Sequence, residues 1–338
     1  MTPLPPNGED ETSVELSVVI PVYRSEESLP GLLQRLAETL PAHFRSFEAI
    51  FVVDGSPDRS FEVLRDLAPS YPFLQAFELR KNVGQDNAIM AGLSRARGEL
   101  VAIMDDDLQH DPNDLPAMAA KVREGWDACF ARFGVRRHSW WKNLGSRFNG
   151  WIASILLGKP GDLYLSPYKI LSKGLVREIA TYRGPYPYID GLIVLNSSRL
   201  TQVPVEHHAR AKGKGNYDLR RSMRVWLKLA TGFSVYPLRA ISFMGFLSSI
   251  LSMIGGLWIF VQHMAVGYRV EGWASLMVTG TFLGGIQLVC LGMIGEYVGR
   301  AYLLAAGHPT YGIRESIGAR DRQPPRDELA KDKAADSR

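Results

Sequence analysis

Residues 100–109 decide the fold: they read Leu-Val-Ala-Ile-Met-Asp-Asp-Asp-Leu-Gln. Five apolar residues without polar alternation indicate a β-strand that is covered on both faces. Three carboxylates follow this run directly. Because ligands of open α/β sheets collect beyond the carboxyl ends of the strands, the acidic residues stand where a ligand site is expected. The stretch therefore predicts a buried strand that ends at a binding site.

Three earlier apolar runs share this pattern, and amphipathic helical segments separate them. They are Leu16–Val22, Ala49–Val53 and Leu74–Leu79. Buried strands that alternate with helices are typical of parallel βαβ units. The first part of the chain is thus predicted to be an α/β domain with a mostly parallel sheet, in which the polar loops after the four strands converge on one crevice.

The acidic run has the composition of a magnesium or manganese site. These ions prefer oxygen ligands and take one or two carboxylates, with water and phosphate oxygens completing the shell. In an extended segment Asp105, Asp107 and Gln109 point to one side and Asp106 to the other. We expect the first three to meet a metal and a diphosphate. A solvated acidic turn, with Asp111 capping the next helix, is the alternative.

The other strand ends add polar groups to the same crevice. Asp54 could accept hydrogen bonds from a base or ribose, although Asp-Gly is also an ordinary turn dipeptide. Pro21 and Tyr23 offer backbone groups and an aromatic face to a base, although Tyr23 could equally pack at a strand edge. Backbone N–H groups near a phosphate are expected at the start of the next helix, which is preceded by Asn82, Val83, Gly84 and Gln85.

The second part of the chain is predicted to lie in a membrane. Ile241–Val266 and Trp273–Val298 each exceed the roughly 20 apolar residues that cross a bilayer as a helix. They predict a hairpin of two transmembrane helices, with two buried helices of a soluble core as the alternative. Small residues at helical spacing, such as Gly280 and Gly284, permit close contact within the hairpin or between the subunits of a homo-oligomer.

Basic residues set the predicted orientation. They cluster before the first span and at Arg300 after the second, whereas the connection holds only Arg269, so both termini should be cytoplasmic. Cys129 and Cys290 fall in different parts of the chain, which leaves no plausible disulfide. The net charge of +4 is mild and gathers beside the membrane, and no nucleic-acid-binding motif accompanies it.

Four ordered motifs carry a family resemblance. They are residues 17–23 (Ser-Val-Val-Ile-Pro-Val-Tyr), 53–56 (Val-Asp-Gly-Ser), 82–85 (Asn-Val-Gly-Gln) and 105–112 (Asp-Asp-Asp-Leu-Gln-His-Asp-Pro). In this order they resemble glycosyltransferase family 2, which has a nucleotide-binding GT-A fold. With the hairpin, the chain is most similar to the polyprenyl-phosphate sugar transferases: dolichyl-phosphate mannose synthases, bactoprenol glucosyltransferases and undecaprenyl-phosphate aminoarabinose transferases.

The resemblance implies roles for individual residues. Pro21, Tyr23 and Glu26 would line the nucleotide pocket, and Asp54 would contact the base or ribose. Asp105, Asp107 and Gln109 would meet the metal and the diphosphate, with Asp106 as a second donor contact. The sugar nucleotide is expected to be a UDP-sugar, with GDP next.

The chain departs from the family pattern at three places. Val53 stands where the family often has a second acid. Lys169, after Tyr168, stands where the family has arginine. Lysine keeps the positive charge but cannot form the two parallel hydrogen bonds of a guanidinium group. Gly215-Asn216-Tyr217 replaces a Ser-Lys-Tyr motif near the acceptor phosphate. A missing cation would therefore have to come from Lys212 or Lys214.

Candidates for the acceptor side follow from charge and position. Asp190 is the first choice for a base or orienting group and Asp162 the second, with a turn or capping role as the alternative for each. A basic cluster just before the first span would hold a lipid phosphate, or else only attract anionic lipids. It comprises Arg210, Lys212, Lys214, Tyr217 and Arg221.

Together these features predict five segments: a disordered lead (1–15), a GT-A glycosyltransferase domain (16–215), a juxtamembrane amphipathic helix (216–239), a transmembrane hairpin (240–300) and a partly disordered cytoplasmic tail (301–338). The predicted activity is metal-dependent, inverting transfer of one sugar from a nucleotide sugar to polyprenyl phosphate at a bacterial inner membrane. Transfer to a hydroxyl of a lipid-linked sugar is one alternative. A non-catalytic sugar-nucleotide-binding scaffold is the other.

Overall fold

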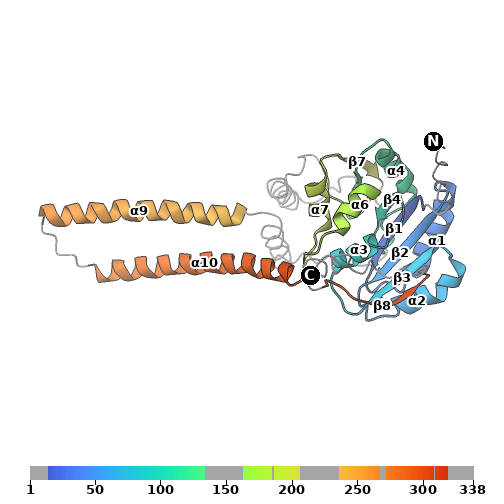
Figure 1. Cartoon of the computed structure of the whole chain (residues 1–338), viewed down its shortest axis with the longest axis horizontal. Coiled ribbons are helices and arrows are strands. Elements are labelled where there is room, and N and C mark those ends of the chain that lie inside the picture. The colour runs from blue at the N-terminus through green and yellow to red at the C-terminus, as the bar shows by residue number, and fades with distance from the viewer. Residues whose placement is uncertain are drawn as a thin grey trace, which may run out of the picture.

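The computed structural model describes residues 14–133, 163–184, 186–205, 236–266, 272–307 and 309–318. An eight-stranded sheet forms the centre of the domain in Figure 1, in the order β7-β5-β6-β4-β1-β2-β3-β8. Its strands are β1 (Leu16–Val22), β2 (Phe47–Val53), β3 (Leu74–Leu79), β4 (Leu100–Ile103), β5 (Ala128–Phe133), β6 (Lys169–Ser172), β7 (Leu200–Val205) and β8 (Ile313–Ile317).

The four strands predicted from apolar runs lie side by side at the middle of the sheet. β1 pairs in parallel with β2 and with β4, and β2 pairs in parallel with β3. The outer part is mixed, because β6 runs antiparallel to both β4 and β5, and β8 runs antiparallel to β3. The sheet is therefore a mixed one, built around a parallel core.

Helices cover both faces of the sheet, as the unbroken apolar strands require. On one face pack α1 (Leu29–Thr39), α2 (Ser60–Leu67) and α4 (Leu115–Arg123), which contribute Leu32, Phe61 and Met118 to one apolar core. On the other face pack α3 (Gln85–Leu93), α6 (Lys173–Ala180) and α7 (Ile189–Asn196). Successive strand residues alternate between the two cores, as Val18 and Val19 do.

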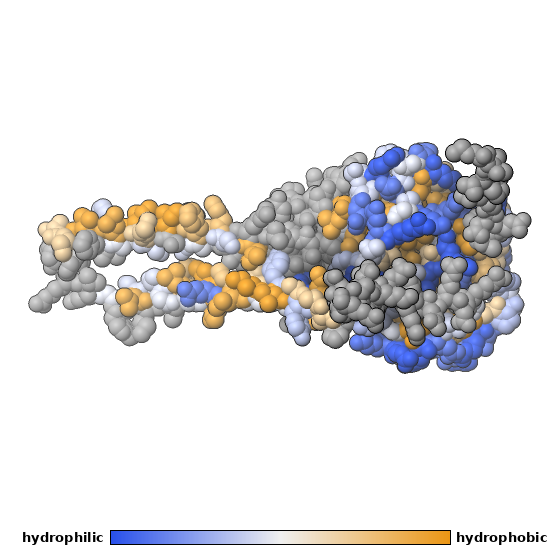
Figure 2. Space-filling view, viewed as in Figure 1, coloured by the Kyte–Doolittle hydropathy of each residue, from blue (hydrophilic) through white to orange (hydrophobic). Residues whose placement is uncertain are grey.

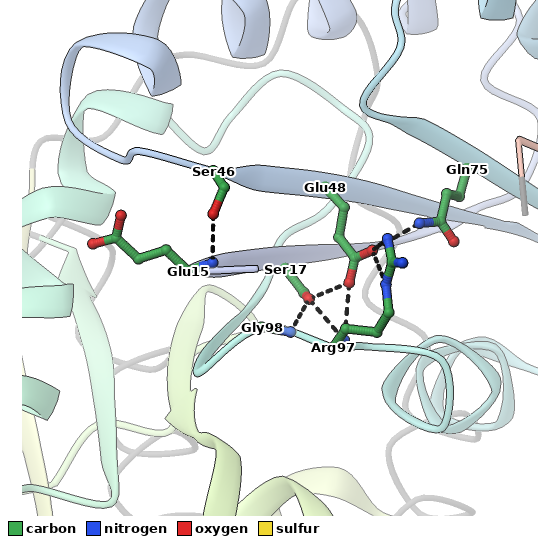
Figure 3. Close-up of polar contacts among 7 residues, drawn as sticks. All are labelled: Glu15, Ser17, Ser46, Glu48, Gln75, Arg97 and Gly98. Carbon is green, nitrogen blue, oxygen red and sulfur yellow. Dashed lines mark hydrogen bonds and ion pairs between the residues drawn. The ribbon is translucent and has the colours of Figure 1, made fainter. Parts of the chain in front are cut away.

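The start of the strands holds a buried polar cluster, shown in Figure 3. Glu48 is 2% exposed, and its carboxylate accepts hydrogen bonds from the Ser17 hydroxyl (2.6 Å), the Gln75 amide (2.7 Å) and three nitrogens of Arg97. Only glycine fits at position 98 beside this cluster, because an added Cβ would lie 2.5 Å from the Ser17 nitrogen. These contacts join β1, β2 and β3 to the loop before β4, at the end of the sheet opposite the acidic run.

Two long helices extend from the domain as a helical arm: α9 (Tyr236–Val266) and α10 (Trp273–Ala305). Residues 282–305 are long and apolar enough to cross a membrane, and none of this window is buried; residues 245–258 form a shorter apolar stretch. Large apolar side chains are exposed, with Leu276 at 76% and Leu288 at 71%. Figure 2 shows this hydrophobic surface along the arm, against the more hydrophilic surface of the sheet domain. Such a patch marks a membrane or partner interface.

The chain returns from the arm to the sheet, which the sequence did not lead us to expect. The tail after residue 300 was expected to be partly disordered and to hold no strand, yet β8 forms the edge strand beside β3. Its charged side chains find partners there: Arg314 pairs with Glu78 (3.0 Å) and Glu315 with Arg65 (2.7 Å). Charged side chains are normal on an edge strand, which explains why apolar patterning did not mark it. At the end of α10, the Arg300 guanidinium lies 5.6 Å from the Tyr186 ring centre.

Candidate active site

The loops after β1 and β4 are joined through Asp106. Its carboxylate accepts hydrogen bonds from the Tyr23 backbone N–H (3.2 Å) and from the Ser25 hydroxyl (2.5 Å). Burial raises the pKa of Asp106, and these two donors oppose the rise. Tyr23 is 45% exposed beside this contact. The carboxylate of Asp106 thus holds the β1 loop against the acidic turn.

Asp105 faces a different partner. Its side chain accepts a hydrogen bond from the Gln85 amide (2.8 Å), which is the first residue of α3. Burial, followed by the neighbouring charges of Asp107 and Asp106, raises the pKa of Asp105 to about 6, while Lys169 and Gln85 lower it. An ionised carboxylate that is disfavoured in this way would gain from a cation.

Asp107 and Gln109 form a pair within the turn. The Gln109 amide donates to one Asp107 carboxylate oxygen (2.5 Å), and the Gln109 backbone N–H donates to the other (3.2 Å). Leu108 between them has a φ of 63°, a left-handed conformation that is uncommon outside glycine. The tight turn therefore holds the Asp107 carboxylate against the backbone and the side-chain amide of Gln109.

Asp54 is occupied by the backbone of the 82–84 loop. Its two carboxylate oxygens accept the N–H groups of Val83 (2.7 Å) and Gly84 (2.8 Å), and it is 4% exposed. Gly55 allows this close approach, since an added Cβ would lie 2.5 Å from the Asn82 nitrogen. The Asn82 side chain donates to the Asp54 carbonyl (3.1 Å). Asp54 thereby fixes the N-terminus of α3, and a contact with base or ribose stays a prediction.

The other residues predicted to line a nucleotide pocket, Pro21 and Glu26, lie near the ends of β1 and β2. Pro21 is buried within β1 opposite Val52, beyond the part of β1 that pairs with β4, so its missing N–H leaves that ladder intact. The exposed Glu26 accepts the Arg59 backbone N–H (2.9 Å). Its own N–H donates to Asp58 (3.2 Å). Hydrogen bonds thus join the loops that follow β1 and β2.

Lys169 and Asp190 form an ion pair that the sequence did not reveal. Lys169 lies on β6 and is 3% exposed; Asp190 lies in the first turn of α7. Their side chains are in direct contact, and the Lys169 charge also acts on Asp105. This pair links the predicted acceptor-side carboxylate to the acidic turn.

One buried residue beside the acidic turn was missed by the sequence reasoning. His110 is 4% exposed, and its Nδ1 accepts the backbone N–H of Asp105 (3.0 Å). A single histidine after an acidic motif carries no pattern that marks such a contact. Asp162 and the basic cluster Arg210, Lys212, Lys214, Tyr217 and Arg221 lie outside the described residues.

The donor set fits a magnesium or manganese ion that shares its ligands with a substrate. Within the described residues, no group of three His, Cys, Asp or Glu side chains forms a metal site by itself. Asp105, Asp107 and Gln109 offer two carboxylates and an amide oxygen, as such an ion prefers when phosphate oxygens and water complete its shell.

The raised pKa of Asp105 gives a stability prediction for metal-free protein. A carboxyl group whose pKa is about 6 when folded and about 4 when unfolded stabilises the fold below pH 4, and this contribution is lost as the pH rises through 6. Asp105→Asn removes the carboxyl group whose ionisation destabilises the fold. The asparagine side-chain oxygen can still accept the hydrogen bond from the Gln85 amide. At pH 7.5 with chelator we expect it to raise the free energy of unfolding by about 1–2 kcal/mol.

Thermal unfolding in chelator checks this prediction. The melting temperature of Asp105→Asn should exceed that of the wild type at pH 7.5, and the difference should shrink at pH 4.5. A variant that melts below the wild type at pH 7.5 would contradict it.

Known proteins resemble the chain over nearly its whole length. The family described as glycosyl transferase family 2 matches residues 17–181. An uncharacterised glycosyltransferase of Synechocystis is 30% identical over 310 residues, which cover 90% of this chain and 96% of that protein. An undecaprenyl-phosphate 4-deoxy-4-formamido-L-arabinose transferase of Edwardsiella ictaluri is also 30% identical, over 90% of this chain and 94% of that one.

Among solved structures, a UDP complex of glucosyl-3-phosphoglycerate synthase from Mycobacterium tuberculosis superposes with a TM-score of 0.48 at 16% identity, over 64% of this chain and 78% of that one. The mixed sheet, the acidic turn at its strand ends and the relatives that match both the sheet domain and the helical arm lead to one assignment. The chain belongs to glycosyl transferase family 2.

Proposed function

We propose that this protein transfers one sugar from a nucleotide sugar, with a UDP-sugar as the first candidate, to undecaprenyl phosphate. The observation that carries the proposal is the acidic turn, held by Gln85 and the β1 loop in the same chain that bears the exposed apolar arm. Relatives whose names state undecaprenyl phosphate as the acceptor match 90% of the chain, which includes the arm.

The arm is proposed to be a transmembrane hairpin in a bacterial inner membrane. Both of its helices exceed the roughly 20 residues that span a bilayer. Since β8 rejoins the sheet after α10, the C-terminal end of α10 lies at the sheet domain. The basic residues before α9 and the Arg300 side chain favour the cytoplasm for that side. Both termini and the catalytic crevice would then be cytoplasmic.

The chemistry is a displacement at the anomeric carbon. A phosphate oxygen of the lipid forms the new bond to this carbon while the bond to the nucleotide diphosphate breaks, and inversion results. A magnesium or manganese ion bound at the turn would offset negative charge on the leaving diphosphate. Asp105, Asp107 and Gln109 would hold it, and Asp106 would keep the β1 loop beside the donor.

The Lys169–Asp190 ion pair bears on whether Asp190 acts as a base. The Asp190 carboxylate is already in contact with the buried Lys169 ammonium, and a lipid phosphate is anionic and needs little proton removal. We therefore propose that the pair fixes charge and geometry next to Asp105, and that Asp190 does not abstract a proton.

Asp190→Asn is expected to lower kcat about tenfold and to leave the KM for the donor within about twofold. It is also expected to lower the melting temperature, because Lys169 keeps its buried charge without the counter-ion. Steady-state kinetics and thermal unfolding measure both effects. The control is Lys169→Met with Asp190→Leu, which should recover stability but not turnover. Unchanged kcat in Asp190→Asn would remove the pair from the mechanism.

One experiment tests the function directly. The full-length protein, purified in detergent, is incubated with undecaprenyl phosphate and a panel of nucleotide sugars, with Mg²⁺, Mn²⁺ or chelator, and the lipid fraction is analysed by mass spectrometry. We expect a glycosylated lipid phosphate from one class of donor, and none in chelator. Glycosylation of hydroxyl-bearing lipid-linked sugars alone would overturn the acceptor, and a rate independent of metal would overturn the role of the acidic turn.

A further inference from the structure

His110 lies in a stack of three rings beneath the acidic turn. Its ring centre is 4.7 Å from that of Tyr168, with an interplanar angle of 8°, and 5.7 Å from that of Phe133, at 14°. Tyr168 is fully buried beside Lys169 of β6, and Phe133 ends β5. The imidazole is therefore held by the residue before β6 and the last residue of β5, which lie outside the turn.

The fixed ring binds the acidic turn at its first residue. The backbone N–H of Asp105 donates to Nδ1 (3.0 Å), and Nε2 lies 4.0 Å from the Asp105 carboxylate. An imidazole nitrogen accepts a hydrogen bond only through a free lone pair, so this geometry assigns the ring proton to Nε2. His110 thus places both the backbone and the side chain of Asp105.

The same stack also fixes the far end of the turn. The Tyr168 hydroxyl donates to the Asp111 carbonyl (2.7 Å), so the segment 105–111 is attached at both ends to one rigid unit. Between these attachments the chain has no regular secondary structure, and Leu108 holds a left-handed conformation. A turn of this kind has many alternative conformations, and its side-chain contacts select one.

We infer that His110 is a positioning residue for donor and metal binding: its Nδ1 sets the backbone of Asp105 at the start of the acidic turn, and with it the direction of the Asp105 carboxylate. This inference rests on the proposed function, but its central claim concerns the geometry of the turn. Two properties of the ring are separable. Stacking needs an aromatic face, whereas the contact with Asp105 needs an acceptor at Nδ1.

Two substitutions separate these properties. His110→Phe keeps the aromatic stack and removes the acceptor, whereas His110→Asn loses the stack but can place its Oδ1 near the Nδ1 position. Hydrogen exchange of the peptide covering residues 105–110 reports the Asp105 N–H whatever reaction the enzyme performs. We expect faster exchange in His110→Phe with little change in melting temperature. We expect nearly wild-type exchange in His110→Asn, with a lower melting temperature.

Kinetics give the second readout. In His110→Phe we expect kcat to fall about tenfold and the Mn²⁺ concentration for half-maximal rate to rise severalfold, while His110→Asn stays within about threefold of wild type. Phe133→Leu is the comparison variant: it weakens the stack on one side and leaves Tyr168 and the Nδ1 acceptor in place, so it should lower the melting temperature while kcat falls less than in His110→Phe. Wild-type exchange in His110→Phe, or slower turnover in His110→Asn than in His110→Phe, would overturn the inference. Absence of transfer by the wild type would overturn the proposed function, while the exchange result would still decide the role of His110.

Discussion

Asp107→Asn is expected to lower kcat about a thousandfold. Removal of one anionic ligand weakens the metal and leaves charge on the departing diphosphate uncompensated, and a thousandfold corresponds to about 4 kcal/mol of barrier. The fold should be unaffected, because asparagine can still accept the backbone N–H of Gln109 through its amide oxygen. The expected result is thus a stable and nearly inactive protein.

Transfer rates and melting temperatures of the purified variant measure this. Asp106→Asn is the matched control, since it removes an adjacent charge whose contacts are Tyr23 and Ser25 of the β1 loop. We expect Asp106→Asn to lower kcat about tenfold and to retain the metal dependence of the wild type. If Asp107→Asn kept more than a tenth of the wild-type kcat, Asp107 would have no place among the metal ligands.

The largest stability effect is expected at the opposite end of the sheet, from Glu48→Ala. This change removes a buried carboxylate and leaves Ser17 and Gln75 without their acceptor and Arg97 without its counter-ion. Because the Arg97 side chain is 46% exposed and can be hydrated, the cost comes mainly from the lost acceptor of Ser17 and Gln75, and amounts to about 2–4 kcal/mol. For a domain of this size the melting temperature should fall by roughly 10 °C.

Thermal unfolding of the full-length protein measures that loss, with Glu124→Gln as control. Glu124 forms an exposed pair with Lys121, and its replacement should change stability by less than about 0.5 kcal/mol. Below its melting temperature Glu48→Ala should keep the wild-type kcat, because its network lies away from the crevice. Equal melting temperatures for the two variants would show that the buried network does not stabilise the sheet.

The core of the fold could be read from the sequence because burial leaves a local pattern. The run Leu16–Val22 was predicted with the bounds of β1, and Leu74–Leu79 with those of β3. β5, β6 and β8 were not predicted. β6 is short, and β8 is a charged edge strand whose partner strand β3 lies more than two hundred residues earlier in the chain. Long-range pairing of this kind leaves no periodicity in its own segment.

The sequence predicted which loops form the site, but not which side chains contact each other in it. The loops with Asp54, Gln85 and Asp105 were expected to converge, and hydrogen bonds do join them. Their directions could not be foreseen: Asp54 turns to backbone N–H groups, and Asp190 meets Lys169 from another element. Sequence motifs name the residues that gather at strand ends, whereas side-chain partners depend on distances that only the folded chain sets.

The return of the chain to β8 has a consequence for how the enzyme meets its lipid. Only residues 306–312 separate α10 from β8, and a fully extended segment of that length spans no more than roughly 30 Å. The sheet edge is thus tethered close to the end of α10. With the arm in a bilayer, the sheet domain stays close to the membrane surface. The lipid phosphate must then reach the crevice by lateral diffusion within the plane of the headgroups, because the catalytic domain cannot travel to meet it.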